Sequence, residues 1–233
     1  MSYFVTGTDT GVGKTLASCA LLYGFAAQGN SVVGMKPVAA GCDDNDQNED
    51  VMQLRAASNV LASKGQINPY CFAQAVAPQL AAQFVGINIS FERILESFAE
   101  LNAQADVVVV EGAGGFLVPL NASQDSADLA VQLGLPVILV VGMRLGCLNH
   151  ALLTVEAIAS RGLTLAGWVA NVLDANMAMP DGNIAILRQR ISAPLLGVIP
   201  HMVRADAHVA AGCLDIGLLQ EKTFGPQVIS DAD

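Results

Sequence analysis

Charged side chains are scarce in this sequence of 233 residues. Asp, Glu, Lys and Arg together make up 14% of it, and only four residues are lysine. Long uncharged apolar runs are missing as well, because the densest one, residues 135–141, ends at Gly142 and Arg144. A membrane-spanning helix needs ~20 mostly apolar residues, so we expect no such helix. The hydrophobic share of 53% therefore indicates a large interior, with an oligomer interface as a second place for apolar surface.

Cysteines are also few, and their spacing excludes two classes of small protein. The five cysteines are odd in number and no two of them lie two positions apart, which disfavours a disulfide framework or a zinc knuckle. Reduced thiols in a cytosolic protein fit best. The N-terminus shows no basic start followed by a longer apolar stretch, so we expect a cytoplasmic protein without a secretory signal.

The charge balance argues against polyanionic partners. The 21 acidic residues outnumber 11 basic ones, for a net charge of −10, which repels nucleic-acid phosphates and anionic lipid. A single tryptophan and three tyrosines offer little for base stacking. The first 42 residues differ from the rest, because their charged residues are Lys14, Lys36 and Asp9.

Short β-branched runs alternate with helical patterns, the rhythm of strand–helix–strand units that form a parallel sheet. The expected strands are residues 3–6, 32–35, 106–111, 137–141, 165–171 and 195–199. The expected helices are residues 14–28, 50–62, 90–104, 126–133, 148–160 and 181–191. We therefore predict an α/β fold with a doubly wound, mostly parallel sheet and helices on both faces. Residues 1–220 are expected to form one domain, and residues 221–233 a disordered tail.

Residues 7–15, Gly-Thr-Asp-Thr-Gly-Val-Gly-Lys-Thr, lie directly between the first strand and the first helix. They supply inward-facing backbone N–H groups, glycines, a helix N-terminus and a lysine, which together bind the phosphates of a nucleotide. Thr15 is the hydroxyl expected to hold Mg²⁺. Five residues separate Gly7 from Gly13 where four are usual, so either Thr8 takes the first glycine position or the loop is one residue longer.

A second motif is the buried strand that ends in Glu111, followed by Gly112, Ala113 and Gly114. In an open parallel sheet, ligands bind at the carboxyl ends of the strands. A carboxylate there, beside a phosphate loop, can ligate Mg²⁺, and the glycines let the backbone approach a phosphate. The alternative is that Glu111 merely caps its loop.

Lys36 ends the second strand, in the segment Met-Lys-Pro-Val-Ala-Ala-Gly. It could be a plain surface charge, but lysine is rare in this sequence. In a doubly wound fold this strand end also lies at the same edge of the sheet as the phosphate loop. Lys36 is therefore a second cation near a reacting phosphoryl group. The acidic residues 43–50 that follow are expected to form a solvated loop, with Asp50 as the exception.

Residues 142–150 form another strand–loop–helix junction, which suits an anion such as a carboxylate. Arg144 and His150 are candidates for catalysis there, although a histidine one turn into a helix is more often a packed or capping residue. His201 follows the last strand and could line a base pocket. His208 has no context that distinguishes it from the surface.

These motifs together resemble those of the dethiobiotin synthetase family. The segments YFVTGTDTGVGKT, GMKPVAAG, VVVVEGAGG, PVILVVGMRLGCLNHALLT, LAGWVAN and PLLGVIP occur in the family's order and spacing, from about residue 3 to about residue 206. The resemblance implies a homodimeric, ATP- and Mg²⁺-dependent cyclo-ligase of biotin synthesis. Such an enzyme builds the ureido ring of dethiobiotin from 7,8-diaminononanoate and CO₂, drawn from bicarbonate.

The resemblance also implies roles for particular residues. Thr15, Asp50 and Glu111 would hold Mg²⁺, and Thr10, Lys14 and Lys36 would surround a carbamate, with the two lysines catalytic. Asn149 would bind the substrate carboxylate, in this family from the partner subunit. The residues expected to bind ATP are Gly11, Val12, Gly13, Lys14, Thr15, Leu16, Asp50, Glu111, Gly112, Ala113, Gly114, Asn171, Val172, Pro200, His201 and Met202.

Three positions depart from the family pattern. Ala40 stands where the family usually has Ser or Thr, and Asn183 lies near the place of a tyrosine that helps to hold the substrate carboxylate. Asp206 is the candidate for an acidic contact to the ribose. The alternative function is a nucleotide-driven dimerising switch, such as a partitioning ATPase. Those proteins commonly carry a second lysine near the start of the loop, and residues 8–12 have none.

Overall fold

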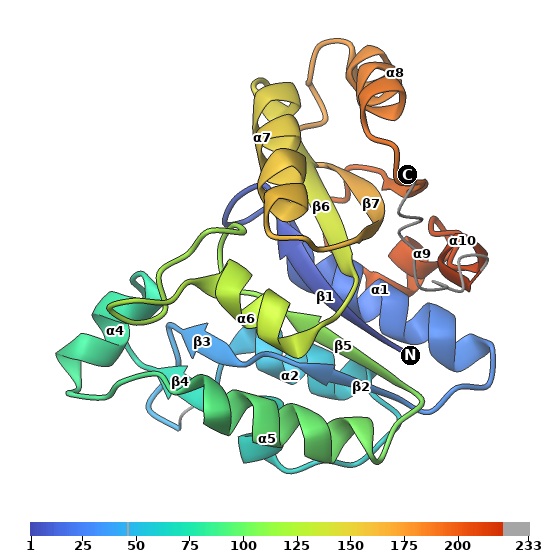
Figure 1. Cartoon of the computed structure of the whole chain (residues 1–233). Coiled ribbons are helices and arrows are strands. Elements are labelled where there is room, and N and C mark those ends of the chain that lie inside the picture. The colour runs from blue at the N-terminus through green and yellow to red at the C-terminus, as the bar shows by residue number, and fades with distance from the viewer. Residues whose placement is uncertain (46, 221–233) are drawn as a thin grey trace, which may run out of the picture.

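A six-stranded, entirely parallel sheet forms the centre of the computed structural model, which describes residues 1–45 and 47–220 (Figure 1). Its spatial order is β2-β5-β1-β6-β7-β8. The bounds are β1 (Ser2–Gly7), β2 (Val32–Met35), β5 (Val107–Glu111), β6 (Val137–Met143), β7 (Leu165–Val172) and β8 (Leu195–Ile199). All six predicted strands are confirmed, each within two residues of its expected ends.

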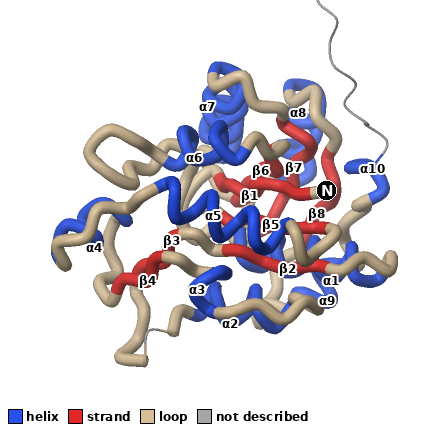
Figure 2. Tube along the Cα trace, turned by 60° about the horizontal axis from the view of Figure 1, so that its bottom comes forward, coloured by secondary structure: helices blue, strands red, loops and turns tan. Residues whose placement is uncertain are grey.

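Helices cover both faces of this sheet, as its two-sided burial requires (Figure 2). Four helices pack on one face, α1 (Lys14–Ala27), α2 (Glu49–Ala57), α9 (Ala207–Ala211) and α10 (Gly217–Gln220). The other face carries α5 (Phe91–Asn102), α6 (Ser126–Leu133), α7 (Cys147–Ser160) and α8 (Pro180–Arg190). The doubly wound, three-layer architecture predicted from the sequence is therefore confirmed.

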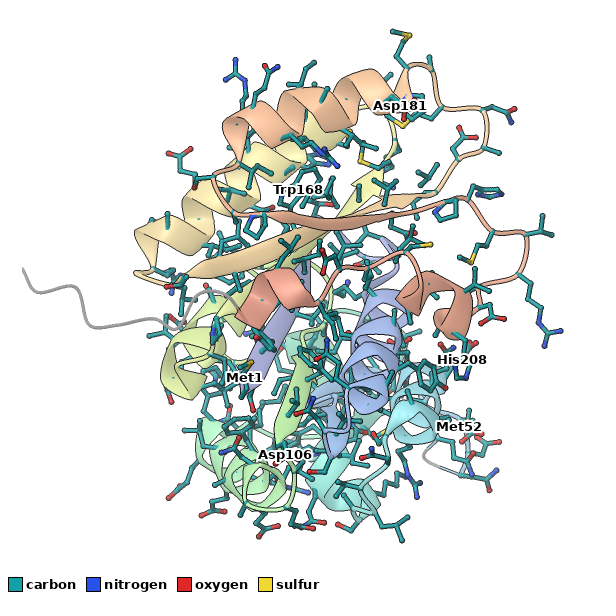
Figure 3. All side chains as sticks on the ribbon, turned by 90° about the vertical axis from the view of Figure 1, so that its right-hand side faces the viewer. Met1, Met52, Asp106, Trp168, Asp181 and His208 are labelled. Carbon is teal, nitrogen blue, oxygen red and sulfur yellow. A yellow bond between two sulfur atoms is a disulfide. The ribbon has the colours of Figure 1, made fainter. Side chains whose placement is uncertain are left out.

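Trp168 shows how completely the second face is closed. Its side chain is fully buried between β7 and the helices α7 and α8 (Figure 3). Apolar residues of these elements surround it, so the sheet itself buries much of the chain's hydrophobic content. Among the described helices none is both long and apolar enough to cross a membrane.

Several short elements were not expected. A separate parallel pair joins β3 (Val38–Ala40) to β4 (Tyr70–Phe72). The short helix α3 (Lys64–Ile67) directly precedes β4 in the chain, and α4 (Pro78–Phe84) follows it. The helices α9 and α10 were not predicted either. Each of these elements is too short to repeat its hydrophobic period often enough to be recognised in the sequence.

The helix expected at residues 50–62 ends at Ala57, so its predicted C-terminal end is wrong. Ser58 leaves the helical conformation, and its hydroxyl accepts a hydrogen bond from Gly34 N at 2.9 Å in β2. The same hydroxyl donates to the carbonyl of Leu54 at 2.7 Å. A serine that bonds to nearby backbone competes with the helical ladder and stops the helix here.

The sheet draws its strands from most of the described chain. One sheet takes strands from β1 to β8, which favours a single domain over residues 1–220, and that assignment stays a prediction. The tail predicted for residues 221–233 lies outside the described residues.

The prediction that all cysteines are reduced is wrong for one pair. Cys42 and Cys71 form a disulfide, with Cα atoms 6.2 Å apart and 29 positions of sequence between them. The pairing of β3 with β4 brings them together, because Cys71 lies opposite Ala39 and Cys42 N donates to Phe72 O at 3.0 Å. Sequence spacing gave no signal of this contact, because β3 and β4 were not predicted.

Alkylation of the unfolded, unreduced protein is expected to label Cys19, Cys147 and Cys213 and to leave Cys42 and Cys71 unlabelled. Reduction should lower the free energy of unfolding by ~3–4 kcal/mol, because the bond closes a loop of intermediate length in the unfolded chain. Peptide mass spectrometry and urea unfolding measure the two effects. Labelling of all five cysteines without reductant would contradict the disulfide, and a variant with serine at both positions should not respond to reductant.

Candidate active site

The loops that carry the predicted motifs meet at the carboxyl edge of the sheet. β1 lies between β5 and β6, its own loop leads to α1 on one face, and the loop after β5 leads to α6 on the other. Such a reversal opens a crevice outside the strand ends. The register places Val5 opposite Glu111, and Gly112 N donates to Val5 O at 2.9 Å. The phosphate loop and the Glu111 motif are therefore neighbours.

Backbone conformation shapes the phosphate loop. β1 continues through Gly7, where a Cβ would come within 2.5 Å of Val12 Cγ2 and 3.1 Å of Lys14 Cγ, so the loop folds back closely on this residue. Only a glycine permits this approach, which favours Gly7 as the first glycine of a loop one residue longer than usual. Gly13 has φ +87° and precedes the first helical residue, Lys14, so the backbone N–H groups of the first turn of α1 face the crevice.

Lys14 is held at the mouth of this loop. Its ammonium donates to the carbonyl of Asp9 at 3.0 Å, and its side chain is 94% buried, since 6% of its surface is exposed. Burial lowers the pKa of Lys14 to about 8, and the nearby charge of Lys36 acts in the same direction. A desolvated cation with a like-charged neighbour is stabilised by any anion that enters the crevice.

Asp9 is a member of this group that sequence analysis left out. Its carboxylate accepts a hydrogen bond from Thr10 N at 2.7 Å and pairs with the guanidinium of Arg144. The Thr10 hydrogen bond and then Arg144 lower the pKa of Asp9. The ion pair thus fastens the phosphate loop to the loop after β6. Thr8 Oγ1 adds a contact to the end of β6, because it accepts from Gly142 N at 3.3 Å. Arg144 therefore contacts the loop rather than the interior of the crevice.

The central feature is a cluster around Glu111, which is fully buried at the end of β5. Its Oε1 accepts hydrogen bonds from Thr15 Oγ1 at 3.0 Å and from Lys36 Nζ at 2.5 Å. Lys36 also donates to Asp50 Oδ2 at 2.8 Å. Lys36 is therefore no surface charge, and Glu111 does more than cap its loop.

The pKa values of the cluster follow from these contacts. Burial alone would lower the pKa of Lys36, but Glu111 and Asp50 outweigh it and raise the pKa. For Asp50, burial acts to raise the pKa, and the charge and hydrogen bond of Lys36 prevail and lower it. Both groups stay charged at neutral pH. Asp50 reaches the cluster because Asn48 caps α2, with its side chain accepting from Asp50 N at 3.1 Å.

The residues present fit a hard divalent cation. Asp50, Glu111 and Thr15 offer only oxygen atoms, the ligands that Mg²⁺ prefers, and two carboxylates are usual where substrate phosphates complete the shell. Glu111 Oε2 is buried and has no hydrogen-bond partner among the described residues. Within the same residues no three His, Cys, Asp or Glu side chains cluster as a metal site. The donor set therefore fits Mg²⁺ better than a transition metal.

A cavity of about 880 Å³ opens beside this cluster and is large enough for a triphosphate with a second substrate. The predicted site residues that line it are Thr10, Gly11, Gly13, Lys14, Thr15, Lys36, Asp50, Glu111, Ala113 and Gly114. Ala40 lies in its wall, as expected of that segment. Three predicted residues pack elsewhere, because Val12 and Leu16 lie in the core around α1 and a Cβ on Gly112 would come within 3.1 Å of the ring of Phe4.

Asn171 connects strand β7 to the phosphate loop. It is buried in β7, and its Nδ2 donates to Val12 O at 2.9 Å, which leaves Oδ1 as the atom that can accept from an adenine amino group. Val172 follows it, and Pro200, His201 and Met202 follow the end of β8. The ring of His201 is within 3.1 Å of Leu173 O.

Other predicted residues lie apart from the cavity. Asn149 and His150 are exposed in the first turn of α7 and do not line it. Asp206 caps α9, with its side chain accepting from His208 N and Val209 N. Asn183 lies on α8 and bonds to Met179 O at 2.9 Å. His208 stacks on Tyr23, with ring centroids 3.7 Å apart.

Sequence reasoning missed much of the cavity wall. Residues 75–78 before and within α4, residues 117–119 after the Glu111 motif, and Asn48 all line it. Both wall segments are apolar and contain no side chain typical of binding or catalysis. Nothing in the sequence therefore distinguished them from residues of the hydrophobic core. Asn48 could have been found, because an Asn two residues before Asp50 has the spacing of a helix cap.

A pair of glycine substitutions tests the junction between Gly13 and Asn171. An alanine at position 11 or 13 would lower the free energy of unfolding by about 1–2 kcal/mol, because the backbone there has a positive φ. Gly11 has nothing within 4 Å, whereas a Cβ on Gly13 would come within 2.2 Å of Asn171 Nδ2. We expect Gly13→Ala to lower the free energy of unfolding by ~1–2 kcal/mol more than Gly11→Ala, and to weaken ADP binding about tenfold more. Urea unfolding and calorimetric titration measure both, and equal effects would contradict the contact.

Comparison with known proteins agrees with this geometry. A family model described as an AAA domain matches residues 1–208. Among solved structures, the MinC:MinD cell division protein complex of Aquifex aeolicus aligns with a TM-score of 0.55, covering 94% of this chain and 89% of that one. The MinD cell division protein of the same organism gives a TM-score of 0.51, covering 95% and 91%. Both are 14% identical in sequence, so they share the fold alone.

Curated relatives are far more similar in sequence. The ATP-dependent dethiobiotin synthetase BioD of Aromatoleum aromaticum is 58% identical over 214 residues, covering 90% of this chain and 95% of the relative. Those of Nitrosospira multiformis and Ralstonia nicotianae are 55% and 54% identical, covering 92% and 93% of this chain and 94% and 96% of the relatives. With the phosphate loop, the Glu111 cluster and the cavity in place, the chain belongs to the ATP-dependent dethiobiotin synthetase family of ligases.

Proposed function

We propose that this protein closes the ureido ring of dethiobiotin from 7,8-diaminononanoate, CO₂ and ATP, releasing ADP and phosphate. One observation carries the proposal: two buried lysines and two carboxylates converge on one cavity beside a phosphate loop. This charge suits a reaction that brings a second anion, the carbamate, up to the triphosphate. The similarity to dethiobiotin synthetases supports the same chemistry.

The reaction brings two anions together. One substrate amine adds to CO₂ and loses a proton, which gives a carbamate. A carbamate oxygen attacks the γ-phosphorus and the bond to ADP breaks, which leaves a mixed carbamic–phosphoric anhydride. The second amine then attacks the anhydride carbonyl, loses a proton and expels phosphate. Carbamate and triphosphate repel each other, so the site must supply positive charge before they meet.

The chain's own groups supply that charge. Lys14 and the N-terminus of α1 would hold the terminal phosphates, with the backbone of residues 11–16 around them. Lys36 would stabilise the carbamate and the phosphoryl group as charge moves between them, and Thr10 would orient the carbamate by hydrogen bonding. Ala40 offers no hydroxyl at this point of the wall, so fewer groups contact the carbamate here.

Thr15, Asp50 and Glu111 would hold Mg²⁺, which when bound offsets the charge of the phosphates. Asn171 Oδ1 would accept from the adenine amino group. Val172, the backbone of residues 200–202 and that of residues 111–114 would enclose the rest of the nucleotide.

We propose further that the protein is a homodimer in which Asn149 binds the substrate carboxylate of the partner's site. Asn149 is exposed and away from the cavity of its own chain, and the loop that precedes α7 carries Leu145, which is 100% exposed. An apolar side chain in that position is suited to burial against a second copy. The acidic net charge supports a cytoplasmic enzyme without nucleic-acid or membrane partners.

Phosphate release is expected to require both diaminononanoate and bicarbonate, with a product mass equal to that of dethiobiotin. Lys36→Ala should lower turnover by about 100-fold or more, because its partner is the reacting group, and should change ADP affinity less than about threefold. Lys64→Ala is the matched control, since Lys64 lies on α3 and does not line the cavity. A coupled phosphate assay and calorimetry measure both quantities.

Fast ATP hydrolysis that ignores both compounds would contradict the ligase. So would a Lys36→Ala variant as active as the parent. An ATP-dependent rise in mass without substrate would favour the nucleotide-driven switch, whereas a dimer insensitive to nucleotide is expected of the ligase.

Mixing two inactive variants tests the shared site. Lys36→Ala disables the site of its own chain, and Asn149→Asp, which repels the substrate carboxylate, would disable the partner's. Random exchange of subunits then leaves one of four sites intact, so the mixture should recover about a quarter of the parent activity. Each variant alone should stay inactive. A mixture that recovers no activity although native mass spectrometry shows mixed dimers would place Asn149 in its own chain's site. An Asn149→Asp variant that is active alone would place Asn149 outside any site.

A further inference from the structure

The ammonium of Lys36 bonds to one oxygen atom of each of the two carboxylates that the proposed function gives to Mg²⁺. Its Nζ is 2.8 Å from Asp50 Oδ2 and 2.5 Å from Glu111 Oε1. Thr15 Oγ1 donates to the same Glu111 oxygen at 3.0 Å. Lys36 therefore contacts two of the three proposed ligands and shares an acceptor atom with the third.

Burial makes this arrangement a stable resting state rather than a passing contact. Glu111 is fully buried and Lys36 is 4% exposed, so each charge depends on the other for compensation. A fixed cation is thus the built-in counter-ion of the carboxylate pair.

Lys36 and a divalent ion cannot both hold these oxygens at contact distance. Mg²⁺ binds carboxylate oxygens at about 2.0–2.1 Å and tolerates little distortion, and an ammonium on the same atoms would repel it strongly. The backbone of Lys36 is anchored, because its N donates to Ile67 O at 2.8 Å and its carbonyl accepts from Asn68 Nδ2 at 2.6 Å. The flexible four-carbon side chain is therefore the part that moves.

The cavity gives that side chain a destination. Lys36 already lines it together with Lys14 and Thr10, the residues proposed to surround the carbamate. An ammonium that leaves the carboxylates enters this space, where it meets the transferred phosphoryl group and its acceptor.

We propose that Lys36 occupies the metal site as its resident counter-ion, and that a divalent cation displaces the ammonium into the cavity. This inference rests on the proposed function for the identity of the metal ligands. Its consequence is an order of events: the catalytic lysine reaches its working position only after the metal has bound. The two cations are thus alternative occupants of one site, although the reaction uses both.

Metal binding without substrate tests this directly. We titrate the full-length protein with Mn²⁺ and follow the free ion by electron paramagnetic resonance, for the parent, Lys36→Met and Lys14→Met. Lys36→Met should bind Mn²⁺ about tenfold more tightly than the parent, because no ammonium competes for the oxygens. Lys14→Met is the matched control: it removes a cation of the same cavity that bonds to Asp9 O rather than to the carboxylates, and should gain less than about threefold.

A second measurement uses the unaltered protein, so it does not depend on the folding of a variant. Competitive acylation of lysines, read by peptide mass spectrometry, should show Lys36 reacting about fivefold faster relative to Lys64 when Mn²⁺ is added, because its amine leaves the buried carboxylates. Equal gains in both methionine variants, no gain in Lys36→Met, or an unchanged Lys36 to Lys64 ratio would each overturn the proposal. These readouts need no turnover, so failure of the ligase assay is a separate result.

Discussion

The parallel pairing of β1 with β5 is the constraint on which the site depends. It sets Val5 opposite Glu111, so that the phosphate loop and a buried carboxylate leave the sheet side by side. The pairing of β2 with β5 in turn places Met35 opposite Val110, which brings Lys36 level with Glu111. A slip of one residue in either register would turn Glu111 toward the opposite face of the sheet and separate it from Lys36.

Charge is distributed unevenly for a reason. The protein carries a net charge of −10, yet Lys14 and Lys36 lie buried in one cavity. The outer charges keep the molecule soluble and repel polyanions, while the inner ones act over short distances in a medium where screening is weak. Placing both lysines together costs stability, since each opposes the other's charge, and Glu111 with Asp50 offsets that cost until anionic substrates arrive. The composition gives only the net charge and not this separation of buried from exposed charges.

Sequence reasoning reached the sheet, the main helices and the chemical core of the site. The strands could be predicted because parallel strands buried on both faces are continuous apolar runs. The motifs at their ends could be predicted because they combine glycines, lysines and carboxylates next to buried strands.

The elements and contacts that could not be predicted have no local signal in the sequence. The pair β3 and β4 is only three residues per strand and depends on a long-range contact. The Cys42–Cys71 bond follows from that contact, and Ser58 ends α2 through a hydrogen bond to another element. Asn48 was within reach of a capping rule, but the apolar wall at residues 117–119 was not.

The contact of Asn171 with the phosphate loop has a consequence for the history of this site. The amide nitrogen fills the space where a side chain on residue 13 would lie, so Gly13 and Asn171 are parts of one fitted surface. A lineage that acquired any larger residue at position 13 would have to give up the amide at position 171 in the same step, and with it the hydrogen bond to Val12 O. The two positions are 158 apart in the chain by their numbering, yet they can change only as a pair. Under the proposed role of Asn171, exchanging adenine for another base would require rebuilding the phosphate loop, whereas the cavity wall at residues 75–78 has no such tie to it.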